Sequence, residues 1–175
     1  MHIVRHVRIV RERMIVMKQS APWLSLASFL VITFAVAGFG SYFTGSSVAT
    51  WYPTLSKPTW TPPNWAFSPV WTVLYVMMAT AGWIVWMRGR SSSAAVALGL
   101  FAVQLVLNAA WSWLFFGMRS VAAGLVDIAL LWCAILATII AFWRVSVLAG
   151  ALMMPYLLWV SYAAALNFVI WKMNG

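Results

Sequence analysis

Acidic residues, histidine and cysteine are almost missing from this sequence, and each shortage excludes a kind of chemistry. The 175 residues include two acids, two histidines and one cysteine. A pair of catalytic carboxylates is not expected, because Glu12 lies in a basic N-terminal segment and Asp127 in an apolar run. His2 and His6 precede the apolar runs, so no Ser-His-Asp or Cys-His arrangement is expected there, and Cys133 alone forms neither a disulfide nor a cysteine-based zinc site. The sequence carries no hydrolase, transferase or metalloenzyme signature.

Charge is also scarce, and this shortage decides the class of protein. Charged residues make up 7% of the chain and hydrophobic residues 65%, whereas about 25% of a soluble domain is charged. Because a membrane span needs about 20 apolar residues, the chain has room for about five. We expect an integral, multi-pass protein of a lipid bilayer. A bacterial cell membrane is favoured over the outer membrane of a bacterium or a mitochondrion.

Apolar runs recur along the chain at about 22–44, 69–87, 94–116, 121–143 and 147–171. They are apolar at both odd and even positions, which favours helices over the alternating strands of a membrane barrel. The predicted fold is therefore all-α, a bundle of five transmembrane helices forming one domain over 21–175. The first run is too long for a typical cleaved signal peptide, so we expect it to remain in the protein.

Residues 1–20 form a basic tail with five Lys or Arg residues. The tail either lies on anionic lipid or is a disordered segment that sets the topology, and the second interpretation is favoured. The positive-inside rule places the N-terminus in the cytoplasm if Met1 is the start, but gives no preference if Met17 is. No basic stripe with interleaved aromatics occurs elsewhere, so nucleic acid is not an expected partner.

A long proline- and tryptophan-rich loop, 45–68, is predicted between the first and second helices. It holds four of the seven prolines, which fix φ and make the loop stiff. Loops of this length are usually functional or disordered, and the aromatics argue against disorder. Trp51, Trp60 and Trp65 either line a rigid flap over a cavity or form an interfacial aromatic belt, and composition alone favours the belt.

Three helices each carry a face that mixes large rings with polar groups. Residues three or four positions apart share a helical face. The faces consist of Trp71 and Tyr75 on the second helix, Gln104, Asn108 and Trp111 on the third, and Tyr156, Trp159, Ala163 and Asn167 on the fifth. Two interpretations fit equally well. The faces either form a pocket for a flat, mostly apolar ligand, or their amides hold the helices together by hydrogen bonds.

Small residues and one acid complete the pattern within the spans. Asp127 lies about 9 Å into the fourth helix and is expected to be neutral or hydrogen-bonded near the interface. Small residues four positions apart favour close helix packing, either within the bundle or between subunits. These are Ala129, Cys133, Ala137 and Ala141 on the fourth helix, and Thr33, Ala37 and Ser41 on the first.

Taken together, these motifs resemble the TspO/MBR family, the tryptophan-rich sensory proteins, whose eukaryotic members are the translocator proteins or peripheral-type benzodiazepine receptors. The likeness covers about 22–172 and is in register across four helices and the loop. The matching residues are Trp51-Tyr52, Leu55, Lys57-Pro58, Trp60, Pro62-Pro63, Trp65, Val70-Trp71, Leu74-Tyr75, Gln104-Leu105, Leu107-Asn108, Trp111, Phe115-Phe116-Gly117, Pro155-Tyr156, Trp159, Ala163 and Leu166-Asn167.

The resemblance implies a five-helix bundle, expected to be a homodimer, with a ligand cavity closed by the first loop. Ligands of the family are porphyrins such as protoporphyrin IX, sterols in eukaryotes, and synthetic isoquinoline carboxamides; no cofactor is required. It implies catalytic roles for Trp71 and Trp159 in light- and oxygen-dependent porphyrin degradation. The implied ligand-binding residues are Tyr75, Asn108, Trp111, Ala163 and Leu166, together with the loop tryptophans Trp51, Trp60 and Trp65.

The leading functional hypothesis is a membrane receptor for porphyrins or another flat amphiphile, acting in tetrapyrrole homeostasis or stress signalling. Rings would stack on Trp and Tyr, and Asn108 and Lys57 would meet polar or carboxylate edges. The spans contain no histidine, the commonest axial ligand of haem iron, so metal-free porphyrin is favoured. The alternatives are a photo-oxidative porphyrin-degrading enzyme and a transporter. Thr59 departs from relatives with a second consecutive tryptophan, and the sterol pattern fails after Tyr162.

Overall fold

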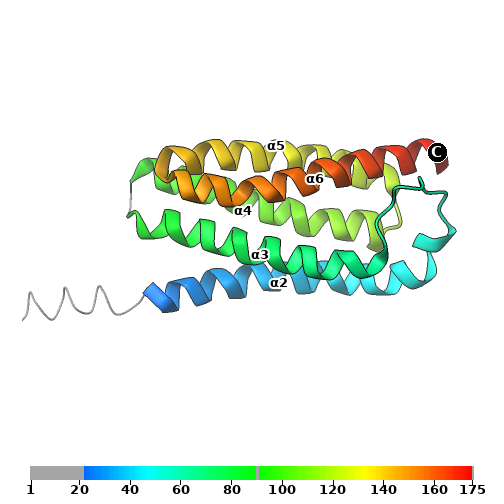
Figure 1. The fold of residues 1–175 in the computed structure, drawn as a ribbon, viewed down its shortest axis with the longest axis horizontal. Helices are drawn as coiled ribbons and strands as arrows, with labels where there is room; N and C mark the ends of the chain where they lie inside the picture. Colours follow the sequence, from blue (N-terminus) through cyan, green and yellow to red (C-terminus); the bar gives the residue numbers. More distant parts are fainter. Residues whose placement is uncertain (1–21, 90, 175) are drawn as a thin grey trace, which may run out of the picture.

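The computed structural model describes residues 22–89 and 91–174, so the predicted basic tail lies outside the described part. Within that part the chain forms five long antiparallel helices, which Figure 1 shows side by side. Each helix is long and apolar enough to cross a bilayer, which confirms the predicted all-α membrane bundle. The helices are α2 (Pro22–Thr50), α3 (Asn64–Met87), α4 (Ser92–Ser112), α5 (Val121–Val145) and α6 (Val147–Asn174).

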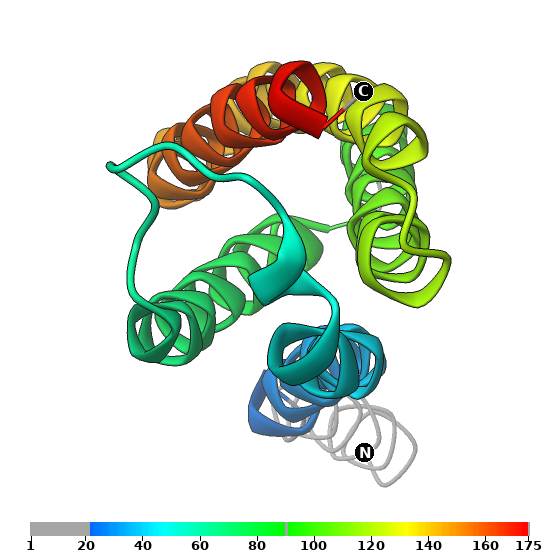
Figure 2. The ribbon, with the colours of Figure 1, turned by 90° about the vertical axis from the view of Figure 1, so that its right-hand side faces the viewer.

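The helices follow one another around the bundle in the order α2, α3, α6, α5, α4, as the view along the bundle in Figure 2 shows. The most extensive packing joins α5 to α4 and to α6, where short connections bring consecutive helices together as antiparallel neighbours. The helix α2 packs against α3 and α4 and is the least buried of the five. The bundle thus has a densely packed side around α5 and a looser side at α2.

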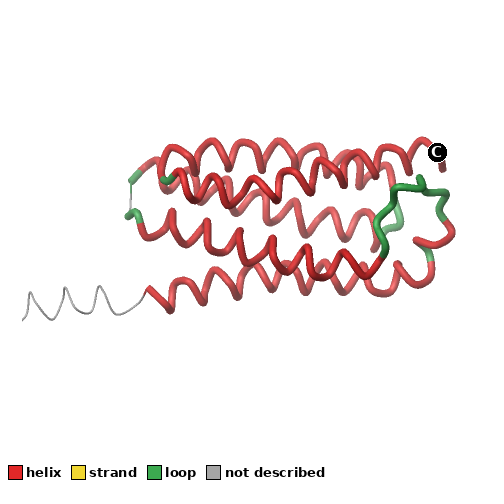
Figure 3. Tube along the Cα trace, in the orientation of Figure 1, coloured by secondary structure: helices red, strands yellow, loops and turns green. Residues whose placement is uncertain are grey.

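The connection between α2 and α3 is shorter than the predicted loop 45–68. The helix α2 continues to Thr50 and α3 begins at Asn64, so the loop covers 51–63 and contains a short 3₁₀ turn, η1 (Tyr52–Thr54). Figure 3 shows it as the longest non-helical segment, crossing one end of the bundle. The expected start of α3 at Pro69 is wrong: Pro63, in an extended conformation (φ −65°, ψ 145°), caps the helix, and Pro69 lies inside it. Pro69 is the sixth residue of α3, so it removes one helical hydrogen bond, the one that its N–H would have donated to the Trp65 carbonyl.

A single π-helical turn, η2 (Trp113–Gly117), ends α4. Its wider turn is closed by the bond from the Met118 N–H to the Trp113 carbonyl, at 2.8 Å. The π turn leaves the adjacent rings of Phe115 and Phe116 both buried. The Ser47 hydroxyl donates to the Phe116 carbonyl at 2.7 Å and fastens the end of α2 to this turn.

The burial and hydrogen bonding of some polar and small residues in the spans could not be read from the sequence. Asp127 is buried, and its Oδ2 accepts no hydrogen bond from the described residues, so the expectation that this acid is neutral or hydrogen-bonded stays a prediction. Both amide atoms of Gln104 are buried without a partner among those residues. Ala129 and Cys133 are exposed on the outside of α5, so they do not pack within the bundle. Their use between subunits stays a prediction.

Candidate ligand pocket

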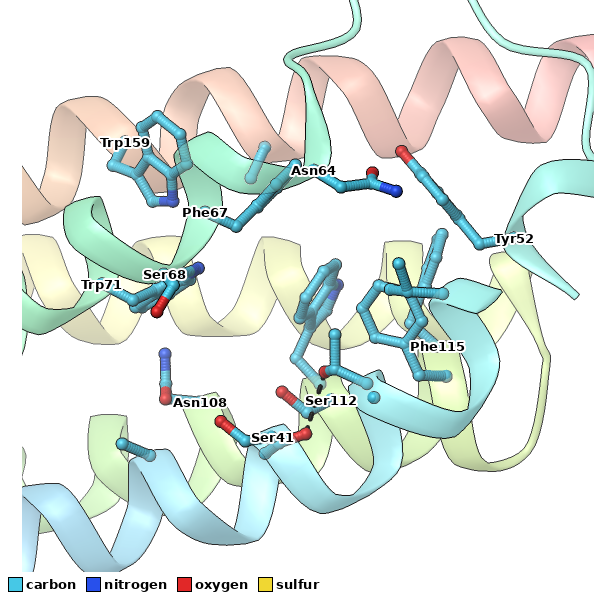
Figure 4. A pocket seen from close by; sticks show the side chains of 18 of the residues that line it. Ser41, Tyr52, Asn64, Phe67, Ser68, Trp71, Asn108, Ser112, Phe115 and Trp159 are labelled. Atoms are coloured by element: carbon cyan, nitrogen blue, oxygen red, sulfur yellow. Dashed lines mark hydrogen bonds between the residues drawn. The ribbon is translucent and has the colours of Figure 1, made fainter. Parts of the chain in front are cut away.

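One end of the bundle contains a pocket of about 640 Å³, within the range of about 300–1,000 Å³ usual for small-molecule sites. Its walls come from α2, α3, α4 with η2, and α6, whereas α5 contributes no lining residue. Figure 4 shows the side chains of these elements pointing into a shared space. The pocket reaches from Tyr52 at the loop end to Phe34, Tyr75 and Asn108 in the interior of the bundle.

Aromatic rings form the pocket walls contributed by α3, α4 and α6. Spacings of four residues place Trp71 above Tyr75, with ring centroids 5.5 Å apart, and Trp111 above Phe115, with centroids 5.2 Å apart. Trp159 on α6 meets Phe67 on α3 edge to face at 6.0 Å. These contacts are in the range that aromatic pairs prefer, so the rings are held by one another before any ligand binds.

The wall formed by α2 is made mostly of small residues, with Phe34 and Val48 as the larger ones. Gly38, Ser41, Gly45 and Ala49 line the pocket and share one face of the helix. A Cβ atom added at Gly38 or Gly45 would meet nothing within 4 Å, so these glycines leave free space. Ser41, expected to pack against another helix, lies in the wall instead. The pocket is thus bounded by rings on one side and by a low wall of glycine, serine and alanine on the other.

A chain of hydrogen bonds fixes the interior end of the pocket. The Tyr75 hydroxyl donates to Asn108 Oδ1 at 2.5 Å, and Asn108 Nδ2 donates to the Tyr156 hydroxyl at 3.0 Å. Nearer the loop, Trp111 Nε1 donates to Asn167 Oδ1 at 3.2 Å. The Asn167 amide also donates to the Val121 carbonyl at 3.0 Å, so each amide bridges two helices. The two interpretations left open by the sequence therefore combine: the amides hold the helices together and also line the pocket.

No charged side chain lines the pocket within the described residues. Lys57, expected to meet a ligand carboxylate, lies outside the wall, and its ammonium donates to the carbonyls of Tyr52 and Leu55 at 2.7 and 2.8 Å. The ammonium also lies 4.8 Å from the centroid of the Tyr52 ring. The ammonium of Lys57 is thus bound by carbonyls of its own loop, and its contact with a ligand carboxylate stays a prediction.

The loop closes the end of the pocket and is fastened to α6 at two places. The Ser56 N–H donates to Asn174 Oδ1 and the Asn174 amide donates back to the Ser56 carbonyl, both at 2.9 Å. The Tyr162 hydroxyl donates to the Trp60 carbonyl at 2.7 Å. Tyr52 is the loop side chain that lines the pocket; burial, and secondarily the nearby Tyr162, raises the pKa of Tyr52 to about 12. Its hydroxyl therefore stays neutral at physiological pH.

Trp51, Trp60 and Trp65 do not line the pocket, and Trp65 lies in the first turn of α3, so the flap interpretation is not supported here. Their contact with a ligand stays a prediction. Trp51 packs edge to face on Phe115, and Trp60 on Tyr162, with centroids 5.6 and 5.5 Å apart. Trp65 is 76% exposed, as the aromatic-belt interpretation expects. Trp51 and Trp60 instead pack the loop against η2 and α6.

The other predicted site residues all lie in the pocket wall, although contact with a ligand stays a prediction. They are Trp71, Tyr75, Asn108, Trp111, Trp159, Ala163 and Leu166. The sequence analysis missed Tyr52, Phe115 and the glycines of α2 as lining residues. Tyr52 and Phe115 were within the quoted motifs, but the 3₁₀ and π turns that aim them inward have no simple periodic signal. Gln104 and Tyr156 share predicted faces with site residues, yet neither lines the pocket.

Comparison with known proteins gives a consistent assignment. The sequence profile described as the TspO/MBR family matches residues 28–172. The chain is 48% identical to the tryptophan-rich protein TspO of Chlorobaculum tepidum over 158 residues, which are 86% of this chain and 96% of the relative. It is 38% identical to protein CrtK of Rhodobacter capsulatus, with coverage of 86% and 95%. It is 39% identical to the translocator protein of Homo sapiens, with coverage of 87% and 92%.

Proposed function

This chain belongs to the TspO/MBR family of membrane proteins, and from that premise we propose that it binds a flat tetrapyrrole, such as metal-free protoporphyrin IX, in its pocket. The observation that carries the proposal is the shape of the wall, with rings from three helices facing a row of small residues on a fourth. A planar ligand would lie between the two, stacking on the rings while the glycines of α2 leave room for its other face. Its role would be in tetrapyrrole homeostasis or stress signalling.

The polar groups of the wall suit the uncharged ring of a metal-free porphyrin, so the two propionates of protoporphyrin IX would have to lie outside the wall. Asn108 and Asn167 are already occupied by neighbouring side chains. The hydroxyls of Ser41, Ser68 and Ser112 make no hydrogen bond with another described side chain or backbone group, and Figure 4 shows them among the side chains around the pocket. A hydroxyl both donates and accepts, so these three can pair with pyrrole nitrogens or with neutral substituents. Burying ionised carboxylates beside them, without a cation, is unfavourable.

Binding is tested by titrating the purified protein in lipid nanodiscs with protoporphyrin IX and following the quenching of tryptophan fluorescence. We expect saturable quenching, and an affinity lowered about tenfold or more in Trp71→Ala and in Asn108→Ala. The matched control is Trp23→Ala, since Trp23 is 76% exposed and does not line the pocket. Equal affinities in the wild type and both pocket variants would contradict the proposal.

A second candidate activity is photo-oxidation of the bound porphyrin, favoured by the positions of Trp71 and Trp159. Both indoles line the pocket, from α3 and α6. The ligand would absorb the light and oxygen would be the oxidant, so the protein needs only to place tryptophans beside the ring. Illumination of the complex in air, with porphyrin absorption as the readout, tests this. Equal bleaching in the wild type and in Trp71→Phe/Trp159→Phe would reject an enzymatic role but leave binding untouched.

A further inference from the structure

The exposed lining residues of the pocket all lie on two neighbouring helices. Those contributed by α4, η2 and α6 are buried or half-buried. The exposed ones occupy one face of α2 and, at spacings of four residues, one face of α3. They are Phe34, Gly38, Ser41, Gly45 and Ala49 on α2, and Asn64, Ser68 and Thr72 on α3. The pocket is therefore open between α2 and α3, at the side of the bundle.

The packing of α2 explains this opening, because α2 changes its partner along its length. In its first half it contacts α3: the Trp83 indole donates to the Pro22 carbonyl at 3.0 Å, and Phe34 lies 6.3 Å from Tyr75. In its second half α2 contacts α4 and η2. A Cβ at Gly40 would lie 3.4 Å from the Ser112 Cβ, and the Ser47 hydroxyl donates to the Phe116 carbonyl in η2. Figure 2 shows the loop-side end of α2 apart from that of α3.

The end of the bundle, by contrast, is closed. Tyr52 is buried over the pocket, and the loop is bonded to α6 through Ser56 and Trp60. A ligand arriving from water through the end would have to break these bonds. A ligand arriving through the side would meet no charged side chain, because the exposed lining residues there are glycines, an alanine, hydroxyl-bearing residues, Phe34 and Asn64.

The side opening also lies at the depth of the lipid chains. Gly38 is twelve residues from the end of α2 at Thr50, which is about 18 Å at 1.5 Å per residue, and a bilayer hydrocarbon core is about 30 Å thick. We propose that the gap between α2 and α3 is a lateral portal through which the pocket exchanges a flat amphiphile directly with the membrane. The proposal rests on the proposed binding function and adds the route and the source of the ligand.

The portal is tested by narrowing it at Gly45, where an added side chain would start in free space and would not clash. Vesicles that contain the protein are mixed by stopped flow with protoporphyrin IX, which dissolves in the lipid, and the quenching of tryptophan fluorescence is followed. In Gly45→Trp we expect association and dissociation both to slow, by about tenfold, whereas a mere loss of ligand space at this lining residue would speed dissociation. The matched control is Ser46→Trp, because Ser46 is the next residue, is exposed and does not line the pocket. Its rates should equal those of the wild type.

A second arm releases the loop with Asn174→Ala/Tyr162→Phe, which removes both attachments to α6. Under the proposal this variant keeps the wild-type association rate. Faster association here, or an unchanged rate in Gly45→Trp, would overturn the lateral route and assign the route to the loop. A raised Kd with unchanged rates of association in Gly45→Trp would also overturn it, because Gly45 would then belong to the binding site alone. Absence of quenching in the wild type would instead refute the proposed binding function.

Discussion

The hydroxyl of Tyr75 donates a hydrogen bond of 2.5 Å to Oδ1 of Asn108, which joins α3 to α4 at the interior end of the pocket. The same amide donates to the hydroxyl of Tyr156 on α6, so one asparagine connects three helices. All three side chains are buried. In the interior of a membrane protein no water replaces a lost partner, so this connection contributes both to stability and to the shape of the pocket.

Removing the asparagine should therefore destabilise the bundle more than removing either tyrosine hydroxyl. We expect Tyr75→Phe to lower the free energy of unfolding by about 1 kcal/mol, and Asn108→Ala by about 2 kcal/mol because it leaves two hydroxyls without this partner. Unfolding in mixed detergent micelles, followed by circular dichroism, measures the difference. Tyr42→Phe is the matched control, since Tyr42 is 78% exposed. A larger effect of Tyr75→Phe than of Asn108→Ala would show that the bridging amide is not the main connection.

The close contact between α2 and α4 at Gly40 predicts a strong dependence on side-chain size. A Cβ at this position would lie 2.9 Å from Ser112 Oγ, so Gly40→Leu should cost about 1–3 kcal/mol through overpacking. Gly38→Ala adds a methyl group in free space on the same helix and should be neutral or stabilising by up to about 1 kcal/mol. Thermal unfolding of the two variants in one detergent gives the comparison. If Gly40→Leu is as stable as the wild type, α2 does not pack as closely on α4 as described.

The attachment of the loop by Asn174 predicts its exchange behaviour. Asn174→Ala removes both bonds to Ser56, so amide hydrogen exchange over 51–63 should accelerate by about tenfold, a loss of about 1.4 kcal/mol of protection. Amides of α5 should not change, because α5 makes neither of these bonds. Lys172→Ala serves as the control, because this neighbour contacts the rings of Phe168 and Trp171 and not the loop. Equal exchange in both variants would show that the loop is held by its aromatic contacts alone.

Gly124 on α5 should affect the pocket although it does not line it. A Cβ there would lie 2.9 Å from the ring of Phe115 and 3.2 Å from Asn167 Oδ1, so Gly124→Ala must displace at least one lining side chain. We expect weaker protoporphyrin quenching, with Kd raised about threefold to tenfold, because overpacking shifts neighbouring side chains. Gly99→Ala, in free space on α4, should leave Kd unchanged. An unaltered Kd in Gly124→Ala would mean that the wall adapts without affecting the ligand.

Part of this structure was predictable because it depends on local periodicity. Apolar runs of span length gave five helices; a spacing of four placed Trp71 with Tyr75, and a spacing of three placed Asn108 with Trp111, on common faces. Helix geometry alone determines which residues share a face. That the faces meet around one pocket was left open by the residues and is found only in the packed bundle.

Other features depend on contacts between distant parts of the chain, and the sequence does not encode them in any simple spacing. The ammonium of Lys57 donates hydrogen bonds to carbonyls of its own loop, and the ring of Trp60 packs on α6. Neither side chain therefore lies in the pocket wall. The sequence by itself determined a membrane bundle and the faces that its helices present, since burial in lipid and the helical repeat act on each segment separately. Only the tertiary structure decided that α2 packs against α4 instead of α3 near the loop, because this packing depends on the close fit of Gly40 against Ser112.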